Sequence, residues 1–124
     1  MHVKDLLKLK GNDVYSITPD ATVYDALKIM AEKEVGALIV LDGDKMVGIL
    51  SERDYARKVI LSGKSSQETL VRDIMTSDVK YVGPDDKVTH CLSLMTKKHF
   101  RHLPVMEQDK VIGVLSVGDV RSRL

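Results

Sequence analysis

The sequence is poor in cysteine and in aromatic residues, and both shortages limit what the protein can be. Its single cysteine, Cys91, cannot form an internal disulfide, and its apolar neighbours predict a buried thiol. The chain has no tryptophan, one phenylalanine and four tyrosines. It therefore lacks an aromatic and basic platform on which nucleic-acid bases could stack.

Long apolar runs and an excess of charge are also missing. No run approaches the length of a bilayer span, and the opening MHVKDLLKLK lacks the apolar core and cleavage site of a secretory signal. The formal net charge of +1 argues against a surface dedicated to nucleic acid or to anionic membranes. We therefore expect a soluble, cytoplasmic protein of one domain or two very small ones, with no nucleic-acid or membrane partner.

Patterns typical of catalytic and metal sites are absent from the sequence too. It contains no Ser-His-Asp or Cys-His arrangement, no paired-carboxylate motif and no P-loop, which predicts a protein that is not an enzyme. His90 and His99 are not i, i+4 partners and have no cysteine beside them, so we expect no structural metal. The methionines at apolar positions are interpreted as core residues: Met30, Met46, Met75, Met95 and Met106.

What the sequence does contain is an internal repeat. A shift of 65 positions lays residues 14–59 on residues 79–124 without a gap, and about a third of the aligned pairs are identical. Identical pairs include Pro19 with Pro84 and Met30 with Met95. The stretch GILSERD, which starts at Gly48, meets GVLSVGD, which starts at Gly113. The chain therefore holds two copies of one supersecondary unit.

The elements of the first copy follow from periodicity and turn residues. A short strand is predicted at Val14–Ile17, and apolar residues at i, i+3, i+4 and i+7 from Val23 predict an amphipathic helix. The apolar run Ala37–Leu41, the turn residues 42–45 and the run Met46–Leu50 predict a hairpin, and a helix should follow Ser51.

The second copy repeats this order, which predicts an α+β fold of two tandem β-α-β-β-α units. One such unit is too small to be stable alone, so we expect the two to pack with pseudo-twofold symmetry into one compact module. The expected boundaries are residues 1–62 for the first motif, 63–69 for a connecting loop and 70–124 for the second motif. Val3–Leu9 should lead into the first motif and Leu70–Met75 into the second.

Each closing motif has two interpretations. A serine at the start of a helix with an acid three residues later approximates a capping box, which stabilises a short helix by about 1 kcal/mol without any ligand. The same groups could bind a ligand, because a carboxylate accepts hydrogen bonds from vicinal hydroxyls and a helix start offers unpaired amides to a phosphate. The two roles can coexist at one helix start.

The duplicated unit with its Gly, Ser and Asp in register resembles a tandem pair of CBS domains, also called a Bateman module. The segments RHLPV at Arg101–Val105 and SERDYARKV at Ser51–Val59 are similar to small stand-alone bacterial proteins of this kind. The resemblance covers nearly the whole chain. It implies regulatory binding of an adenosine nucleotide such as AMP, ADP, ATP or NAD(H) in clefts between the two copies, with no catalytic cofactor.

The resemblance also implies roles for individual residues. It makes Asp54 and Asp119 the ribose binders and Ser51 and Ser116 the phosphate contacts. The purine should lie against the start of each first strand, near the residues Val14, Tyr15, Ser16, Val79 and Tyr81.

The family architecture implies that the closing motif of one copy faces the strand entry of the other, which makes the two clefts unequal. Asp54 is then expected near Arg101, His102 and Pro104, with Arg53 also available for a phosphate. Asp119 is expected near Gly36, Ala37 and Ile39, in a cleft without basic residues that holds a neutral adenosine part or is weakly occupied. Arg57 and Lys58 are interpreted as solvated helix charges.

The functional hypothesis is a ligand-sensing module that forms a homodimer and whose state is read by an unidentified regulated protein. Three alternatives stay open at this point. The chain could be a structural dimerisation or scaffold protein with empty clefts, a sensor of another adenosyl ligand such as S-adenosylmethionine, or a small nucleotide-processing enzyme.

Overall fold

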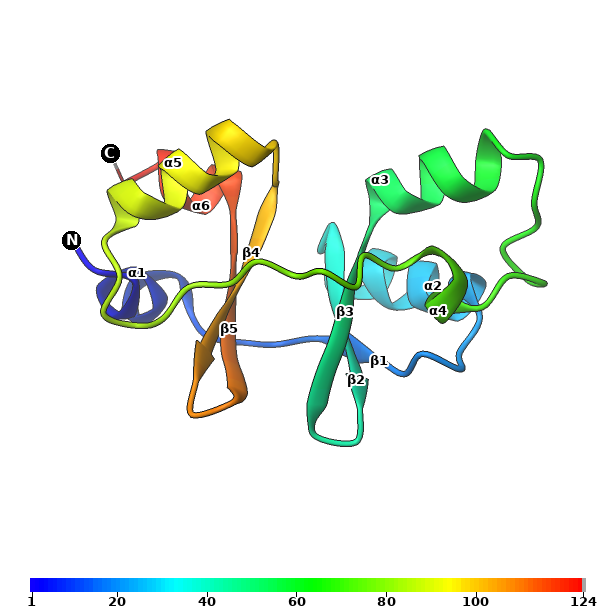
Figure 1. Cartoon of the computed structure of the whole chain (residues 1–124), viewed down its shortest axis with the longest axis horizontal. Helices are drawn as coiled ribbons and strands as arrows, with labels where there is room; N and C mark the ends of the chain where they lie inside the picture. The colour runs from blue at the N-terminus through cyan, green and yellow to red at the C-terminus, as the bar shows by residue number, and fades with distance from the viewer. Residues whose placement is uncertain (124) are drawn as a thin grey trace. The chain divides into compact units, whose positions relative to one another are not determined.

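The fold was analysed in a computed structural model that describes residues 1–123. The chain divides into two compact units (Figure 1). The first unit comprises residues 15–79, and the second unit comprises residues 1–14 together with the chain from Lys80 onward. Each unit contains one copy of the repeat, so the α+β fold with two tandem units is confirmed.

The first unit contains a three-stranded sheet in the order β1-β2-β3. Strand β1 (Ser16–Ile17) runs parallel to β2 (Ala37–Asp42), which pairs antiparallel with β3 (Lys45–Ser51). Helix α2 (Val23–Lys33) connects β1 to β2. After β3 come α3 (Glu52–Tyr55), a π-helical segment η1 (Ala56–Ile60) and the single helical turn α4 (Val71–Ile74).

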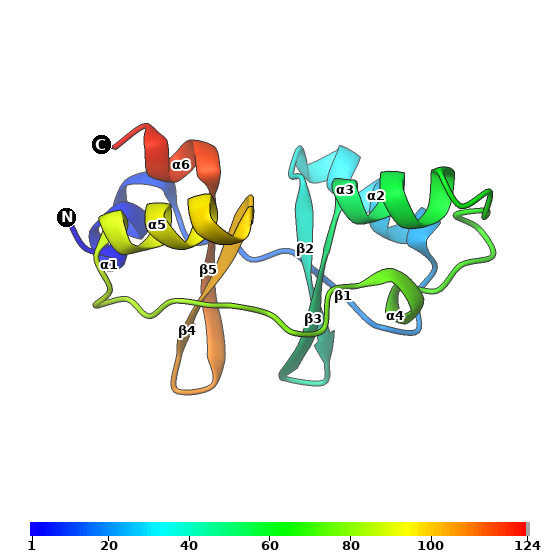
Figure 2. The same ribbon diagram turned by 45° about the horizontal axis from the view of Figure 1, so that its top comes forward.

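The second unit is built around an antiparallel hairpin of β4 (His102–Glu107) and β5 (Lys110–Ser116). Its helices are α1 (Val3–Lys10), α5 (Val88–Lys98) and α6 (Val117–Arg121), which lie beside the hairpin and away from its turn in Figures 1 and 2. The strand expected at the start of this copy is reduced to one parallel bridge between Val82 and Val105. It corresponds to the pairing of Ile17 with Val40 in the first unit.

Helices α2 and α5 form where the apolar spacing predicts them. In α2 the buried residues are Val23, Ala26 and Met30, and the Thr22 hydroxyl caps the helix by accepting a hydrogen bond of 3.1 Å from the Asp25 amide. The buried residues of α5 are Val88, Cys91 and Met95. Cys91 is fully buried, which confirms the interpretation of its thiol.

The two hairpins share their register although their turns differ in sequence. Val40 lies opposite Gly48, and Val105 lies opposite Gly113, with an irregularity after each valine. The first turn uses Gly43 at φ 64°, whereas the second holds Gln108 and Asp109 at φ 51° and 65°. Glycine is therefore not required for the turn, and the shared irregularity supports a common origin of the two copies.

Each unit has a hydrophobic core of its own, and the helices that precede the motifs complete these cores in a way that the sequence does not predict. Val3, Leu6 and Leu7 of α1 belong to the core of the second unit, and Val71 and Ile74 of α4 belong to the core of the first. Each helix thus packs with the copy that it does not precede in the sequence.

Backbone hydrogen bonds fix α1 in the second unit. The Val3 amide donates to the Asp86 carbonyl at 2.8 Å, the Lys4 amide to Pro84 at 2.9 Å, and the Val88 amide to Met1 at 3.0 Å. These bonds satisfy amides at the starts of α1 and α5, which have no partners inside their own helices. Residues 1–10 are therefore part of the fold of the second unit.

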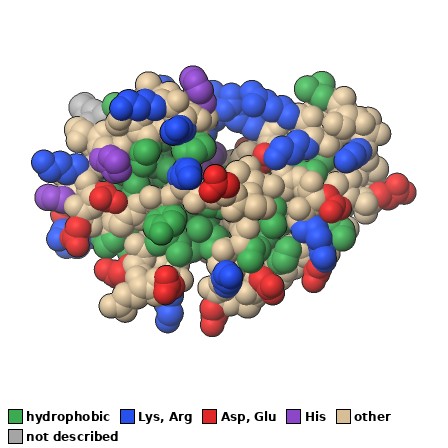
Figure 3. Space-filling model, in the orientation of Figure 1, with side chains coloured by type: hydrophobic (Ala, Val, Ile, Leu, Met, Phe, Trp, Pro, Cys, Tyr) green, Lys and Arg blue, Asp and Glu red, His purple; other side chains and the backbone are tan. Residues whose placement is uncertain are grey.

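The surface visible in Figure 3 carries charged side chains of both signs, interspersed with one another, in keeping with the nearly balanced composition. Among the described residues 1–123, none of the helices has the length and apolar character that a membrane span requires.

Candidate functional site

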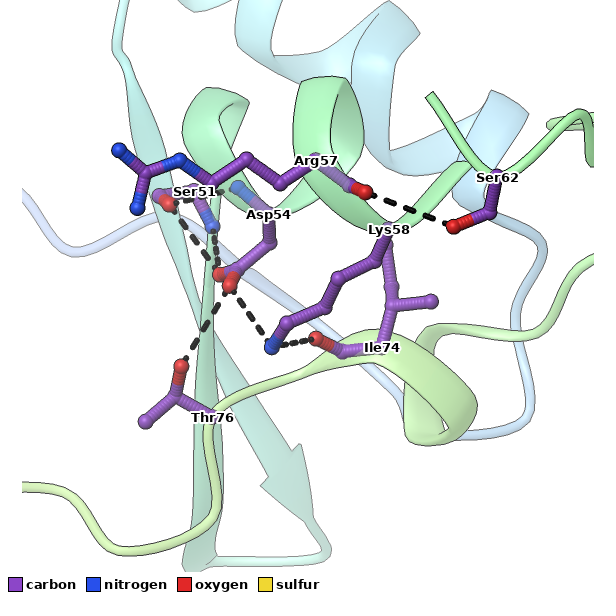
Figure 4. A network of polar contacts seen from close by, with 7 residues as sticks. All are labelled: Ser51, Asp54, Arg57, Lys58, Ser62, Ile74 and Thr76. Atoms are coloured by element: carbon purple, nitrogen blue, oxygen red, sulfur yellow. Dashed lines mark hydrogen bonds and ion pairs between the residues drawn. The ribbon is translucent and has the colours of Figure 1, made fainter. Parts of the chain in front are cut away.

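In the first unit, Ser51 and Asp54 form a reciprocal capping arrangement at the start of α3. The Asp54 amide donates to Ser51 Oγ at 3.2 Å, and the Ser51 amide donates to Asp54 Oδ2 at 2.9 Å (Figure 4). The Ser51 hydroxyl also donates to Asp54 Oδ2 at 3.1 Å. The capping interpretation of this motif is confirmed, and the carboxylate is held in one orientation.

The second oxygen of Asp54 is also occupied. Lys58 Nζ lies 3.0 Å from Asp54 Oδ1 and donates to the Ile74 carbonyl at 2.8 Å, and Thr76 Oγ1 donates to Asp54 Oδ1 at 3.5 Å (Figure 4). The Asp54 side chain is only 12% exposed. Both carboxylate oxygens therefore have partners from the first unit itself.

Lys58 is exposed, as a solvated helix charge would be, but its ammonium also forms an ion pair that this interpretation did not include. Lys58 follows Asp54 by four positions, and η1 continues α3, so the ammonium returns to the carboxylate. The wider π-helical turn is visible in the bond from the Leu61 amide to the Ala56 carbonyl at 3.0 Å. Arg57 is exposed, and its contribution to the network in Figure 4 is its backbone carbonyl, which accepts from the Ser62 hydroxyl at 3.5 Å.

In the second unit, Ser116 and Asp119 repeat the capping arrangement at the start of α6. The Asp119 amide donates to Ser116 Oγ at 3.1 Å, and the Ser116 amide donates to Asp119 Oδ2 at 2.8 Å. Lys10 Nζ lies 3.3 Å from the same Oδ2 and donates to the Val114 carbonyl at 2.8 Å. A lysine therefore neutralises this aspartate as well.

The expectation that the surroundings of Asp119 lack basic residues is wrong. Lys10 forms an ion pair with Asp119, and His102 lies directly opposite Ser116 in the β4–β5 hairpin. Burial lowers the pKa of His102, an effect that the Asp119 carboxylate opposes and that the charges of Arg101 and Lys10 reinforce. Lys10 could not be predicted as a neighbour of Asp119 from the sequence, because it lies on α1, at the other end of the chain.

The two carboxylates differ in how open they are. The Asp119 side chain is 27% exposed, against 12% for Asp54. Within residues 1–123, Oδ1 of Asp119 has no hydrogen-bond or ion-pair partner, whereas both oxygens of Asp54 do. Asp119 is therefore the carboxylate with accepting capacity left for a ligand.

Two predicted site residues of the first unit, Gly36 and Ala37, lie next to the start of α3. Ala37 pairs with Ser51 across the hairpin, and the Glu52 amide donates to the Gly36 carbonyl at 3.0 Å. Ser16 is exposed and pairs with Ile39 in the neighbouring strand. The half-buried Tyr15 packs against the core of this unit. Val79, also half-buried, is the last residue of the first unit.

The remaining predicted residues, apart from Arg53, lie in the second unit. Arg101 is exposed, and its carbonyl accepts a hydrogen bond of 2.8 Å from the Val117 amide, as Gly36 does for α3. Pro104 is buried in β4, and Tyr81 is 59% exposed. Val14 is half-buried at the end of the second unit's N-terminal segment. Arg53, in the first unit, is exposed on α3. The pairing of each aspartate with residues of the other copy stays a prediction.

Sequence reasoning missed Lys10 and Thr76 as site residues. The sequence holds only a weak signal for their equivalence. The shift of 65 positions that aligns the two copies also aligns Lys10 with Met75, the residue before Thr76. These segments occupy similar places, since Thr76 pairs through its backbone with Ile49 of β3 while Lys10 bonds to Val114 of β5. Without identical residues at these positions, the repeat could not reveal them.

No group of three or more histidine, cysteine, aspartate or glutamate side chains that could hold a metal ion occurs in residues 1–123. Each unit contains one Ser–Asp–Lys arrangement in its described residues.

The duplicated fold and its two capping motifs agree with a comparison to protein families. The family described as "CBS domain" matches residues 3–61 and again residues 71–124. The chain belongs to the CBS-domain family. It is a CBS-domain pair, and such pairs are regulatory modules. The family resemblance drawn from the sequence is confirmed.

Individual CBS proteins resemble the chain over most of its length. "CBS domain-containing protein CBSX3, mitochondrial" of Arabidopsis thaliana is 42% identical over 127 residues, a match that covers 95% of this chain and 62% of the relative. A solved protein with CBS domains from Burkholderia ambifaria MC40-6 is 48% identical with a TM-score of 0.96, covering 99% of this chain and 93% of that one.

A third comparison concerns a CBS-domain pair solved with ligands. The pair of protein MJ0100, in complex with 5'-methylthioadenosine and S-adenosyl-L-methionine, has a TM-score of 0.87 and covers 99% of this chain and 94% of that one. The sequence identity is 24%, and at this level the structural likeness shows a shared fold alone.

Proposed function

We propose that this CBS-domain pair is a regulatory sensor of adenosine-containing ligands, with AMP, ADP, ATP and NAD(H) as the candidates, and that it is not an enzyme. The observation that carries the proposal is the Asp119 carboxylate. It is fixed by Ser116, is 27% exposed, and has an oxygen without a partner in the described part of the chain. Such a group can accept hydrogen bonds from the two vicinal hydroxyls of a ribose.

The surroundings of Asp119 suit the rest of such a ligand. Lys10 supplies a positive charge beside the carboxylate, so a phosphate group would meet an ammonium in the same unit. In this proposal a purine lies against the start of each first strand, at Val14, Tyr15 and Ser16 in one copy and at Val79 and Tyr81 in the other. Arg53, Arg101, Gly36 and Ala37 stay proposed ligand contacts.

The first unit has a weaker case for binding. Asp54 is 12% exposed, and its oxygens already accept hydrogen bonds or ion pairs from Ser51, Thr76 and Lys58. A ligand there would have to displace at least one of these partners. This observation favours a structural role for the Ser51–Asp54 motif, and it makes a structural dimerisation or scaffold protein with empty clefts the second candidate function.

A ligand panel separates the proposals. The wild-type protein is titrated calorimetrically with AMP, ADP, ATP, NADH, adenosine and S-adenosylmethionine, and its melting temperature is measured at millimolar concentrations of each. A ligand present at 100 times its Kd should raise the free energy of unfolding by about 2.7 kcal/mol. If none of the six changes the heat signal or the melting temperature, the sensor proposal fails and the scaffold is favoured.

Two controls address the remaining alternatives. Asp119→Asn should weaken binding of the preferred ligand, whereas Asp13→Asn, at an exposed carboxylate on the same unit, should not.

Chromatography of the ligand after prolonged incubation should recover it unchanged, because a sensor binds without turnover. Sedimentation with and without ligand tests the proposed homodimer, and recovery of hydrolysed ligand would favour an enzyme.

A further inference from the structure

Lys10 is held in a defined place beside Asp119, and this order has a physical basis. Its helix α1 is fixed by buried Val3, Leu6 and Leu7, and the Gly11 amide closes the helix end on the Leu7 carbonyl at 2.8 Å. From this base the Lys10 ammonium contacts Asp119 Oδ2 at 3.3 Å and the Val114 carbonyl at 2.8 Å. Its side chain is 26% exposed, so most of it is packed against protein.

The first unit reaches the same arrangement from a different element. Lys58 of η1 contacts Asp54 at 3.0 Å and the Ile74 carbonyl at 2.8 Å. The repeat position of Lys58 is Arg123, which is exposed and follows the end of α6. The second unit therefore lacks an equivalent lysine on its closing helix, and Lys10 takes this place. In both units an ammonium bridges the motif carboxylate and a main-chain carbonyl, although the two lysines are not repeat equivalents.

The other basic group close to Asp119 is less suited to carry a charge at neutral pH. His102 lies opposite Ser116, and its burial lowers the pKa of the imidazole. Arg101 is exposed, and its described contact is made by its backbone carbonyl. Lys10 is therefore the cation that the structure places in contact with the motif carboxylate.

The ion pair has consequences for a ligand that uses Asp119. Hydroxyl groups that bond to this carboxylate compete with Lys10 for its negative charge. A neutral nucleoside would weaken the ion pair without supplying an anionic group that the Lys10 ammonium could contact. A ligand with a phosphate would give the ammonium a new anionic partner as it took the carboxylate, so the exchange would favour the charged ligand.

We propose that Lys10 is a ligand-binding residue of the Asp119 site and sets its preference for anionic adenosine ligands over neutral ones. The inference rests on the proposed function, because it names the charge selectivity of that same site. When ligand is absent, Lys10 neutralises Asp119. When an anionic ligand binds, the ammonium turns to the ligand while the carboxylate takes the ribose hydroxyls.

The test compares AMP with adenosine in two variants of the same helix. Lys10→Met removes the ammonium and keeps an unbranched apolar stem, and Lys4→Met removes a lysine that is 53% exposed and pairs with Asp85. Both are made in an Asp54→Asn background, so that the titration reports the Asp119 site. Kd values for both ligands come from calorimetry, and melting temperatures establish that each variant is folded.

The affinities of the two ligands should respond differently to the loss of the ammonium. We expect Lys10→Met to weaken AMP binding about tenfold, as the loss of a charge-assisted contact would. Adenosine binding should stay the same or strengthen, because the carboxylate loses its competitor. Lys4→Met should change neither, and Lys10→Arg should retain a preference for AMP. A merely structural Lys10 would weaken both ligands equally.

Three outcomes overturn the inference in distinguishable ways. Equal loss of AMP and adenosine affinity in Lys10→Met, or no change in either, rejects Lys10 as the selectivity residue and leaves the sensor proposal intact. A wild-type protein that binds adenosine and AMP equally well rejects the charge preference itself. A wild-type protein that binds none of the six ligands of the panel rejects the proposed function and the inference together.

Discussion

Gly48 lies so close to Thr76 that a Cβ atom on the glycine would be 2.9 Å from the Thr76 carbonyl oxygen. The same atom would be 2.7 Å from Met75 Sδ. The close approach allows Thr76 to pair with Ile49 through two backbone hydrogen bonds of 2.9 and 3.0 Å and brings its hydroxyl to Asp54. The glycine of GILSERD is thus part of what positions the carboxylate.

Gly48→Ala should therefore destabilise the protein. The clash includes the Thr76 carbonyl oxygen, and because backbone cannot rotate away as a side chain can, we expect the free energy of unfolding to fall by about 1–3 kcal/mol. Urea unfolding measures this value.

Two other glycines provide matched controls for this substitution. A Cβ at Gly113 would meet the flexible Leu7 side chain at 2.7 Å, so Gly113→Ala should cost less than Gly48→Ala. A Cβ at Gly118 would find its nearest atom at 3.7 Å, and this change should be neutral or slightly stabilising. Equal effects at all three positions would contradict the argument from close approach.

Removal of the two motif carboxylates should affect stability unequally. Asp54→Ala removes a buried group bonded to Ser51, Thr76 and Lys58, and we expect a loss of about 1–3 kcal/mol in the free energy of unfolding. Asp119→Ala removes fewer contacts from a more exposed position and should cost less. Chemical denaturation of both variants beside Asp13→Ala gives the comparison, and a larger loss at Asp119 would reverse our assignment of roles.

The stability of the second unit should depend on the protonation of His102. Burial lowers its pKa in the folded protein below the usual 6.5, so the unfolded chain binds the proton more readily. This contribution to stability is fully present above about pH 6.5 and is lost as the pH falls below that value. The neighbouring charges are Asp119, which acts against the shift, and Arg101 and Lys10, which act with it.

Urea midpoints at pH 7.5 and pH 5.5 test this dependence. The decrease between the two should be smaller in His102→Gln than in the wild type, while the exposed His90→Gln should behave as the wild type does. An identical decrease in all three proteins would show that His102 titrates alike in the folded and unfolded states.

Cys91 should be unreactive in the folded protein. It is fully buried, and its burial, followed by the charge of Asp86, raises the pKa of the thiol to about 11. Since the thiolate is the nucleophile, reaction with Ellman's reagent at pH 8 should require unfolding and should accelerate with urea. Rapid reaction in the absence of denaturant would contradict the core position of this residue.

Much of each unit could be predicted from the sequence because the relevant interactions are local. Apolar periodicity placed α2 and α5, turn residues placed both hairpins, and the spacing of Ser51 and Asp54 predicted the cap that the structure confirms. The first strand of the second copy was the weakest of these predictions. Its counterpart in the first unit has two residues, and here a single bridge at Val82 remains.

Contacts between distant segments could not be predicted in this way. The amphipathic pattern of α1 shows that the helix needs an apolar partner, but several apolar surfaces in the chain could serve. The structure packs α1 in the core of the second unit, and this places Lys10 at Asp119. Likewise, a charged residue such as Lys58 looks the same in the sequence whether it contacts solvent or a carboxylate.

The sequence by itself determined the duplication, the α+β order of each copy and the paired Ser–Asp motifs, because periodicity, turn chemistry and capping act over a few residues. Only the tertiary structure decided which helix completes which core, which lysine neutralises each aspartate, and that Asp119 keeps an open oxygen while Asp54 does not. Those outcomes depend on burial and charge pairing between segments far apart in the chain. Local sequence patterns therefore do not predict these contacts.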